Sequence, residues 1–557
     1  MKKIWLPNYE SNVPADIKVD RFQSLVEVFD ETLRKFADRP AFHNLGRTIT
    51  FADLDRLSRA FAGFLQQRGL TRGERIALMM PNLLQYPVAL FGALRAGLVI
   101  VNTNPQYTAR ELRHQLTDSG ATAVVVLANF AHVVQQVLPE TSVRTVVVTE
   151  IGDLLPQPRR SAVNFVVRRL RHMVPSFHID GAIGLREALE RGRKVELRAP
   201  SITSTDLAFL QYTGGTTGVP KGAMLSHGNL VANLEQVSAF WSSVIDDGHD
   251  VVITPLPLYH IFCLTCNCLT FMKHGGLNVL ITNPRDIPAT LAEMRKWQFS
   301  IITGVNTLYR GMLNHANFSS LDFSRLKLGA AGGMPLHPEV ARRWREATGR
   351  PLLEGYGLTE ASPVVACNPP HGEFDGTIGT PLPSTDISIR EGERELDVGE
   401  RGELCVRGPQ VMLGYWQRPE ETAKTLSADG WLRTGDVAVI DEKGRLRIVD
   451  RIKDMIIVSG FKVFPNEIDS VLEAHPDVAE AAAIGVADER TGQAVKVFIV
   501  PRAGTQLTAE QVMDYCKANL VPYKMPSYIE FRDSLPKSNI GKVLRRALAT
   551  ETRAAAA

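Results

Sequence analysis

Residues 207–222 read LAFLQYTGGTTGVPKG, an apolar run that leads directly into a loop rich in glycine and threonine. The apolar part, 207–212, predicts a buried strand. Glycine lets a backbone N–H approach an anion closely, and threonine hydroxyls add donors. The positions that we expect to contribute are Thr213, Gly214, Gly215, Thr216, Thr217, Gly218, Lys221 and Gly222. The sequence therefore predicts a phosphate-binding loop at the end of a strand, against the alternative of an ordinary surface turn.

The loop differs from the common nucleotide P-loop, in which a serine or threonine follows the lysine and holds magnesium. Here Gly222 follows Lys221, so this is another kind of phosphate loop. A second lysine-bearing loop, PKSNIGK at 536–542, ends in Lys542.

Size and composition set the broad class. A chain of 557 residues is too long for one core and predicts two to four domains. Its hydrophobic content of 44% and charged content of 22% are typical of a globular protein. The net charge of +3 lacks the basic excess of a nucleic-acid-binding protein, so we expect no nucleic acid partner. Cys263, Cys266 and Cys268 lie in an apolar run, which favours buried side chains over a metal site.

Helix and strand patterns alternate through the first 450 residues. Thr50 can cap a helix that ends near Gly69, and 75–80, 123–127, 146–149, 251–256, 277–282 and 300–304 read as short strands. This alternation predicts an α/β fold, with a large N-terminal domain (1–450) of mostly parallel sheets covered by helices. The charged stretch DRIKD at 450–454 predicts a boundary, followed by a small, mobile α+β domain at 451–557.

Further loops join glycines to polar side chains. They are GAAGGMPL (329–336), EGYGLTE (354–360) and DGWLRTGD (429–436). Each loop alone is a weak signal, because a glycine turn with an acid is usually solvated. Together and in this order, the chain resembles the adenylate-forming superfamily of acyl-CoA synthetases, luciferases and adenylation domains, almost from end to end. Within this superfamily, 429–454 resembles the signature of fatty acyl-CoA synthetases, and residues 80–97 and 279–288 are similar to bacterial long-chain fatty acid–CoA ligases.

The resemblance implies a ligase reaction in two steps. A fatty acid attacks ATP to give an acyl-adenylate and pyrophosphate, and coenzyme A then displaces AMP to give the thioester. ATP, Mg²⁺ and coenzyme A are the implied cofactors. Such chemistry depends on stabilising charge around phosphates more than on a protein nucleophile.

The resemblance also implies a role for each matching residue. The loop 213–221 holds the outer phosphates, Thr359 contacts the α-phosphate, and Glu360 is the metal ligand. Gly332, Gly333, Gly355 and Tyr356 flank the adenine, while Asp436 and Arg451 hold the ribose. Lys542 bridges the carboxylate and the α-phosphate as a catalytic residue. Lys453 is the implied hinge, and Gly460, Phe461 and Lys462 the implied contacts of the pantetheine arm.

Gly357 is the residue that the resemblance connects with acid size, because a bulky aromatic replaces it in relatives that use very small acids. We expect the absent side chain to let an acyl pocket extend between Tyr259, Ile261, Phe262, Leu264, Val305 and Leu308. His260 is more simply a core histidine than a base. A medium-chain or aryl acyl-CoA ligase is the alternative enzyme, and an inactive acyl- or nucleotide-binding protein is the alternative of another class.

The stretch 158–174, PRRSAVNFVVRRLRHMV, is basic and apolar by turns. As a helix it is typical of a segment that lies on a membrane surface, with a helix packed on its own protein as the alternative. No apolar run reaches the length of a membrane span, and the start lacks a signal-peptide core. We therefore expect a cytoplasmic protein, with peripheral attachment to the inner membrane as a hypothesis. The oligomeric state stays open between monomer and homodimer.

Overall fold

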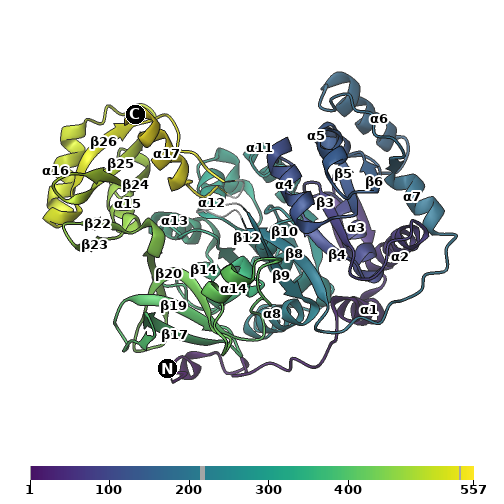
Figure 1. The fold of residues 1–557 in the computed structure, drawn as a ribbon, viewed down its shortest axis with the longest axis horizontal. Helices are drawn as coiled ribbons and strands as arrows, with labels where there is room; N and C mark the ends of the chain where they lie inside the picture. Colours follow the sequence, from purple (N-terminus) through teal and green to yellow (C-terminus); the bar gives the residue numbers. More distant parts are fainter. Residues whose placement is uncertain (1, 214–219, 539–540, 557) are drawn as a thin grey trace.

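The computed structural model describes residues 2–213, 220–538 and 541–556. Its long axis runs from a small C-terminal unit at one end to helices of the N-terminal part at the other (Figure 1). Two mainly parallel sheets lie between these ends. The expected α/β class is confirmed, with parallel-rich sheets in the large N-terminal part and a smaller C-terminal domain.

The first sheet has seven strands in the order β7-β6-β5-β3-β4-β8-β9. Every neighbouring pair is parallel except β8 with β9. The strands are β3 (Arg75–Met79), β4 (Val99–Asn102), β5 (Ala123–Leu127), β6 (Thr145–Thr149), β7 (Ile183–Gly184), β8 (Leu207–Thr213) and β9 (Lys221–Ser226). Their helices are α2 (Phe51–Gln67), α3 (Gln85–Arg95), α4 (Ala109–Ser119), α5 (Ala131–Val137), α6 (Arg159–Phe165) and α7 (Leu185–Gly192).

The second sheet has nine strands in the order β16-β15-β14-β13-β12-β10-β11-β1-β2, and its six central strands are parallel. The strands are β1 (Pro40–Asn44), β2 (Arg47–Thr50), β10 (Val251–Thr254), β11 (Leu277–Leu280), β12 (Ile301–Gly304), β13 (Leu328–Ala331), β14 (Leu352–Gly357), β15 (Val364–Cys367) and β16 (Thr380–Pro381). The accompanying helices are α1 (Leu25–Phe36), α8 (His227–Phe240), α9 (Ile261–Cys263), α10 (Thr270–Lys273), α11 (Ile287–Met294), α12 (Asn306–Leu313) and α13 (Pro338–Thr348).

Two further sheets follow along the chain. An antiparallel sheet holds β17 (Asp386–Glu391), β18 (Arg394–Glu395), β19 (Gly402–Arg407), β20 (Leu432–Ile440) and β21 (Leu446–Arg451), with α14 (Pro419–Thr425) beside it. The last sheet holds β22 (Ile456–Val458), β23 (Phe461–Val463), β24 (Val478–Asp488), β25 (Gly492–Pro501) and β26 (Pro526–Phe531). Its helices are α15 (Pro465–Glu473), α16 (Ala509–Asn519) and α17 (Arg545–Ala556). The change of sheet falls between Arg451 and Ile456.

Local sequence signals account for several boundaries. The Thr50 side chain accepts a hydrogen bond from the Asp53 N–H, and the Asp53 carboxylate accepts one from the Thr50 N–H. This reciprocal cap fixes the start of α2. Just past its end Gly69 has a φ of +75°, a left-handed conformation that suits glycine. The three closely spaced cysteines, Cys263, Cys266 and Cys268, are free and buried, as expected.

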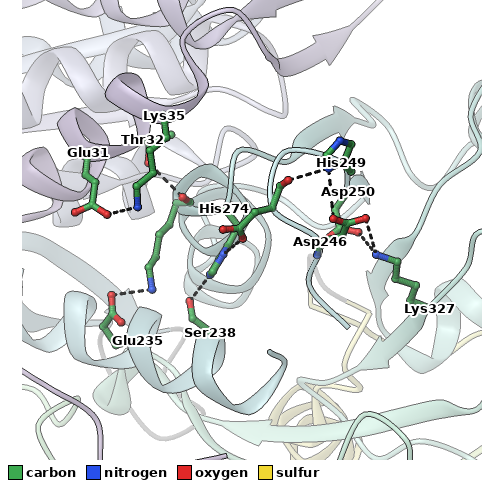
Figure 2. Close-up of polar contacts among 12 residues, drawn as sticks. Glu31, Thr32, Lys35, Glu235, Ser238, Asp246, His249, Asp250, His274 and Lys327 are labelled. Atoms are coloured by element: carbon green, nitrogen blue, oxygen red, sulfur yellow. Dashed lines mark hydrogen bonds and ion pairs between the residues drawn. The ribbon is translucent and has the colours of Figure 1, made fainter. Parts of the chain in front are cut away.

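Polar contacts join α1, α8 and α10 (Figure 2), and the Thr32 hydroxyl of α1 donates to the Lys273 carbonyl of α10 at 3.5 Å. Lys273 forms an ion pair with Glu235 at 2.8 Å. The His274 ring lies between Asp247 (2.6 Å from Nδ1) and Ser238 (3.0 Å from Nε2). This serine–histidine–aspartate order is that of a hydrolase triad. Ser238 is nevertheless only 6% exposed inside a helix, so we interpret the contacts as structural.

Candidate active site

One large cavity, of about 770 Å³, opens where strands of three sheets end. Its walls come from the ends of β4, β8, β13 and β14, from β20 and β21, and from residues 538 and 542–544 of the C-terminal domain. Carboxyl ends of parallel strands are where ligands bind in α/β sheets. The sequence analysis had placed the glycine- and threonine-rich loop at this carboxyl edge of the sheet.

The cavity brings together most of the residues that the sequence singled out. Its lining includes Thr213, Lys221, Gly332, Gly333, Gly355, Tyr356, Gly357, Thr359, Glu360, Asp436, Arg451 and Lys542. Gly214, Gly215, Thr216, Thr217 and Gly218 lie outside the described residues. The two ends of that loop, Thr213 and Lys221, are direct partners across the antiparallel pair β8 and β9.

Asp436 is the centre of a buried polar group. β20 and β21 are antiparallel, and their register sets Asp436 opposite Arg451. The Arg451 Nε lies 3.1 Å from one Asp436 oxygen, and the Tyr356 hydroxyl donates to the other at 2.6 Å. Burial, together with this carboxylate, raises the pKa of Tyr356 well above its ordinary value. The carboxylate therefore presents oriented oxygens that accept hydrogen bonds at the cavity wall.

Glu360 and Lys221 both contact Tyr415, an aromatic residue that the sequence analysis did not identify. The Tyr415 hydroxyl donates to a Glu360 oxygen at 2.7 Å, while the Lys221 ammonium lies 5.0 Å from the centre of the Tyr415 ring. Lys221 also forms an ion pair with Glu421 of α14. The lysine is thus held by a carboxylate that a bound polyphosphate would compete with.

Lys542 reaches the cavity from the C-terminal domain. Its loop is closed by two hydrogen bonds with Ser538, from the Ser538 N–H to the Lys542 carbonyl at 2.7 Å and from the Lys542 N–H to the Ser538 hydroxyl at 3.1 Å. Burial, with repulsion from Arg451, lowers the pKa of Lys542 from 10.5 to about 8. Within the described ranges no carboxylate lies within ion-pair distance of its ammonium. The cavity therefore contains a cation that an anionic ligand would stabilise.

The residues fit a magnesium ion that is held mainly by a substrate. Among the described residues, no three histidine, cysteine or carboxylate side chains form a ready-made metal cluster. Glu360 offers one carboxylate at the cavity wall. Mg²⁺ is commonly bound by one or two carboxylates together with substrate phosphates and waters, so a single acidic ligand suits it.

The turn at 460–462 lies elsewhere. Gly460, Phe461 and Lys462 are absent from the cavity lining in the part of the chain that the structure describes. Phe461 is 54% exposed and stacks on Tyr523, with ring centres 4.7 Å apart. Lys462 faces Glu391 at 3.5 Å. In this arrangement Lys542 occupies the cavity and the turn does not.

The apolar wall differs in part from the expectation. Tyr259, Ile261 and Phe262 line the cavity as expected. Leu264, Val305 and Leu308 do not appear in the lining, because they are packed in the main hydrophobic core. Trp241, Cys266, Ala331, Val364 and Cys367 line it instead. The tryptophan comes from the end of α8, far from the motifs, and no sequence signal identified it.

His260 lies beside this wall and stays neutral. Burial lowers its pKa to about 4. Its Nδ1 accepts a hydrogen bond from the Phe262 N–H at 3.3 Å, which caps the short helix α9. The ring is therefore a structural cap at neutral pH, in line with the sequence interpretation.

Gly357 has a packing role in addition to the one expected from acid size. A Cβ added at this glycine would lie 2.3 Å from the Pro363 carbonyl oxygen and 2.8 Å from its carbonyl carbon. Those atoms belong to the turn that leads into β15, and the β14–β15 register shifts at this point. Glycine is needed here so that two backbone segments can approach each other. In this chain, a side chain at position 357 would require the Pro363 backbone to shift.

Asn102 and Gln211 are also lining residues that the sequence analysis missed. Each stands near the carboxyl end of its strand, β4 or β8. The Asn102 amide donates to the Gln211 side chain at 2.9 Å, and the Gln211 amide donates to the Tyr259 carbonyl at 2.9 Å. Polar residues that end apolar strands were the available signal.

Comparison with known proteins agrees with this geometry. Residues 29–416 match the model of the AMP-binding enzyme family, and residues 467–542 match the AMP-binding enzyme C-terminal domain. The chain belongs to the AMP-binding enzyme family. The resemblance predicted from the motifs is confirmed.

Particular relatives narrow the class. The chain is 54% identical to the long-chain-fatty-acid–CoA ligase of Escherichia coli O157:H7 over 99% of each sequence. ATP-bound MatB from Rhodopseudomonas palustris has a TM-score of 0.81, 28% identity and coverage of 95% of this chain and 99% of that one. The anthranilate CoA ligase AuaEII, solved with anthranoyl-AMP, has a TM-score of 0.85 at 24% identity, over 97% and 100% of the two chains, and shows the fold alone.

Proposed function

We propose that this chain activates long-chain fatty acids to acyl-CoA thioesters. It is an AMP-forming acid–thiol ligase that uses ATP, Mg²⁺ and coenzyme A. The fatty acid carboxylate attacks the α-phosphorus of ATP and pyrophosphate leaves; the coenzyme A sulfur then attacks the acyl carbon and AMP leaves. The observation that carries this proposal is one cavity whose lining combines apolar side chains with cationic and hydroxyl groups.

The polar side of the cavity suits a nucleotide. We assign Asp436 and Arg451 to the ribose, since a buried carboxylate held by an arginine accepts hydrogen bonds from hydroxyls well. Tyr356 and the glycines 332, 333 and 355 are assigned to the adenine. Thr213, Lys221 and the loop 214–218 between them are assigned to the β- and γ-phosphates, where a compact ammonium makes a point contact.

The reacting atoms meet Thr359, Glu360 and Lys542 in this assignment. Thr359 donates to the α-phosphate. Glu360 would hold Mg²⁺, which when bound neutralises phosphate charge. Lys542 bridges the acid carboxylate and the α-phosphate, because its desolvated ammonium favours a site with added negative charge. Together these side chains stabilise charge that develops at the α-phosphorus.

The positions of the two loops support a proposal on how the domains divide the reaction. We assign 1–450 to a large adenylating domain and 451–557 to a small domain that turns about Lys453. Lys542 in the cavity, with Gly460, Phe461 and Lys462 outside it, corresponds to the adenylating arrangement. Rotation would bring the turn to the cavity for contact with the pantetheine arm of coenzyme A. Domain motion of this kind commonly gates catalysis.

The test is acid-dependent ATP–pyrophosphate exchange and thioester formation with acids from acetate to oleate, and with benzoate. Long-chain acids should give the highest kcat/KM in both assays. Maximal activity with a medium-chain or aromatic acid would establish the alternative ligase. Exchange without thioester would indicate an enzyme that stops at the adenylate, and no exchange with any acid would indicate an inactive binding protein.

A second proposal concerns a membrane surface as partner. In the described part of the chain, no helix is long and apolar enough to cross a bilayer. α6 and the helical turn at 166–170 carry four exposed apolar side chains on or just beyond them: Phe165 (58%), Val166 (37%), Leu170 (64%) and Met173 (51%). Exposed Arg169 and Arg171 accompany them, while Arg168 is paired with Glu150. An exposed apolar and basic helix of this kind suits the interface of an anionic membrane.

Charge reversal tests this peripheral attachment at the cytoplasmic face. We expect Arg169→Glu with Arg171→Glu to weaken co-sedimentation with anionic vesicles by at least about fivefold per arginine, from roughly 1 kcal/mol each. Arg325→Glu with Arg490→Glu, two exposed arginines outside this helix, is the matched control. Binding that is insensitive to salt and equal in both variants would refute attachment through this helix.

A further inference from the structure

A second cleft, of about 170 Å³, lies in the N-terminal part of the chain. It shares no lining residue with the large cavity. The helices that form it, α2, α6 and α7, lie at the end of the molecule opposite the C-terminal domain (Figure 1). Whatever it binds is therefore not part of the ligase site.

Arginine dominates this cleft. Its lining contains five arginines, one in each of β2, α2, α6 and α7 and one just after α7: Arg47, Arg56, Arg160, Arg186 and Arg193. Only two carboxylates, Asp153 and Glu190, lie among them. Guanidinium groups repel one another, so an anion bound among them would lower that repulsion.

Carboxylates of the protein pair with two of the five arginines, and one of these pairs joins Arg56 to Asp53 at 2.8 Å. Asp153 accepts hydrogen bonds from the Thr149 hydroxyl at 3.0 Å and the Glu150 N–H at 2.8 Å, and no arginine is its ion-pair partner in the described ranges. Glu190 pairs with Arg186 at 3.6 Å, both on the exposed side of α7. Arg160 and Arg193 have no carboxylate partner in the described part of the chain.

The framework of the cleft is fixed by tight packing. α7 lies directly on α2, because a Cβ at Gly192 would come 1.8 Å from the Ala60 carbonyl oxygen. This contact holds Arg186 and Arg193 beside Arg56. On the other side, the Arg47 guanidinium donates to the Leu154 carbonyl and so fixes the loop that leads to α6 and Arg160. The arginines are thus presented by packed elements.

We infer that this arginine cleft binds a phosphoryl group, either on a lipid headgroup or on a soluble phosphate ester. Planar guanidinium groups match phosphate oxygens in pairs, and several donors from different directions select an anion with three free oxygens. The cleft adjoins α6, whose exposed apolar side chains we assign to a membrane. The inference does not depend on which acid the ligase activates.

The experiment compares full-length protein with the variant R160Q/R193Q. The control R325Q/R490Q changes two exposed arginines outside the cleft and has the same net charge. One arm measures co-sedimentation with phosphatidylcholine vesicles that contain or lack phosphatidic acid. The other measures equilibrium dialysis of labelled glycerol 3-phosphate. Single variants R160Q and R193Q are included in case the double variant does not fold.

We expect the cleft variant to lose about fivefold in affinity per arginine for at least one probe. The control should lose less than about twofold, since exposed distant charges are screened. A loss confined to phosphatidic acid vesicles identifies a lipid headgroup, and a loss for glycerol 3-phosphate identifies a soluble ester. Equal binding of both probes by the cleft and control variants would overturn the inference.

Discussion

Replacement of Lys542 by alanine removes a cation whose charged form is destabilised by burial in the cavity. Burial and Arg451 lower its pKa from 10.5 to about 8, a difference of about 3 kcal/mol against the charged form. Negative charge at the α-phosphate stabilises the charged form of Lys542. This stabilisation is greatest in the transition state, where more negative charge develops. Loss of one such group typically slows a reaction by about 10²–10³. We expect Lys542→Ala to slow adenylate formation by at least this factor.

The assay separates the two half-reactions. Palmitate-dependent ATP–pyrophosphate exchange reports the first, and conversion of pre-made palmitoyl-adenylate with coenzyme A reports the second, which should stay near normal. Lys537→Ala is the control, because Lys537 lies on the same loop but pairs with Glu480 at 2.6 Å. Equal slowing of both steps by Lys542→Ala would refute the assignment.

The same lysine sets a pH dependence. A lowered pKa means that Lys542 in the free enzyme loses its proton as the pH rises through about 8. The kcat/KM of adenylation, which reports the free enzyme, should therefore fall above pH 8. Bound phosphates favour the charged form, so kcat should hold to higher pH. A kcat/KM that stays flat through this range would contradict a protonated Lys542 as the active form.

Three other substitutions test separate parts of the site. Glu421→Gln releases Lys221 from an ion pair of about 0.2–1 kcal/mol, so the KM for ATP should fall by up to about fivefold. The control Glu420→Gln, on the same helix, should leave the KM unchanged. A higher KM in Glu421→Gln would show that Glu421 supports ATP binding. Lys453→Pro should slow thioester formation but leave adenylation unchanged, because proline fixes φ at the hinge. Lys453→Ala is the control. Equal effects of the proline and alanine variants on thioester formation would exclude a hinge role. Gly357→Ala should lower the free energy of unfolding by about 1–3 kcal/mol, because its Cβ would clash with Pro363. Gly184→Ala, which has open space around its Cβ, is the control and should not lower it. Thermal unfolding curves measure the difference, and an unchanged midpoint in Gly357→Ala would contradict the packing explanation.

Much of the fold could be predicted because its signals are local. The Thr50 cap, Gly69 and the apolar strand at 207–212 each depend on a few adjacent residues, and the structure has the corresponding elements. The edge where the candidate residues meet followed from a general rule about parallel strands. The motif residues Asp436, Arg451 and Lys542 then converged on one cavity.

What the sequence could not predict depends on contacts between distant segments. Tyr415 and Glu360 are 55 positions apart in the sequence, and no pattern in either segment indicates that they form a hydrogen bond. Leu308 was expected at the acyl wall but packs in the core, because an apolar residue near a motif suits either place. Gly357 required the position of the Pro363 backbone, which only the folded chain supplies.

The most direct test of the central claim is a single-turnover reaction with ATP labelled at the α-phosphate, Mg²⁺ and palmitate, first without and then with coenzyme A. The account predicts labelled palmitoyl-adenylate in the first stage, converted to labelled AMP and palmitoyl-CoA in the second. Formation of labelled ADP, or adenylate with benzoate but none with palmitate, would contradict it.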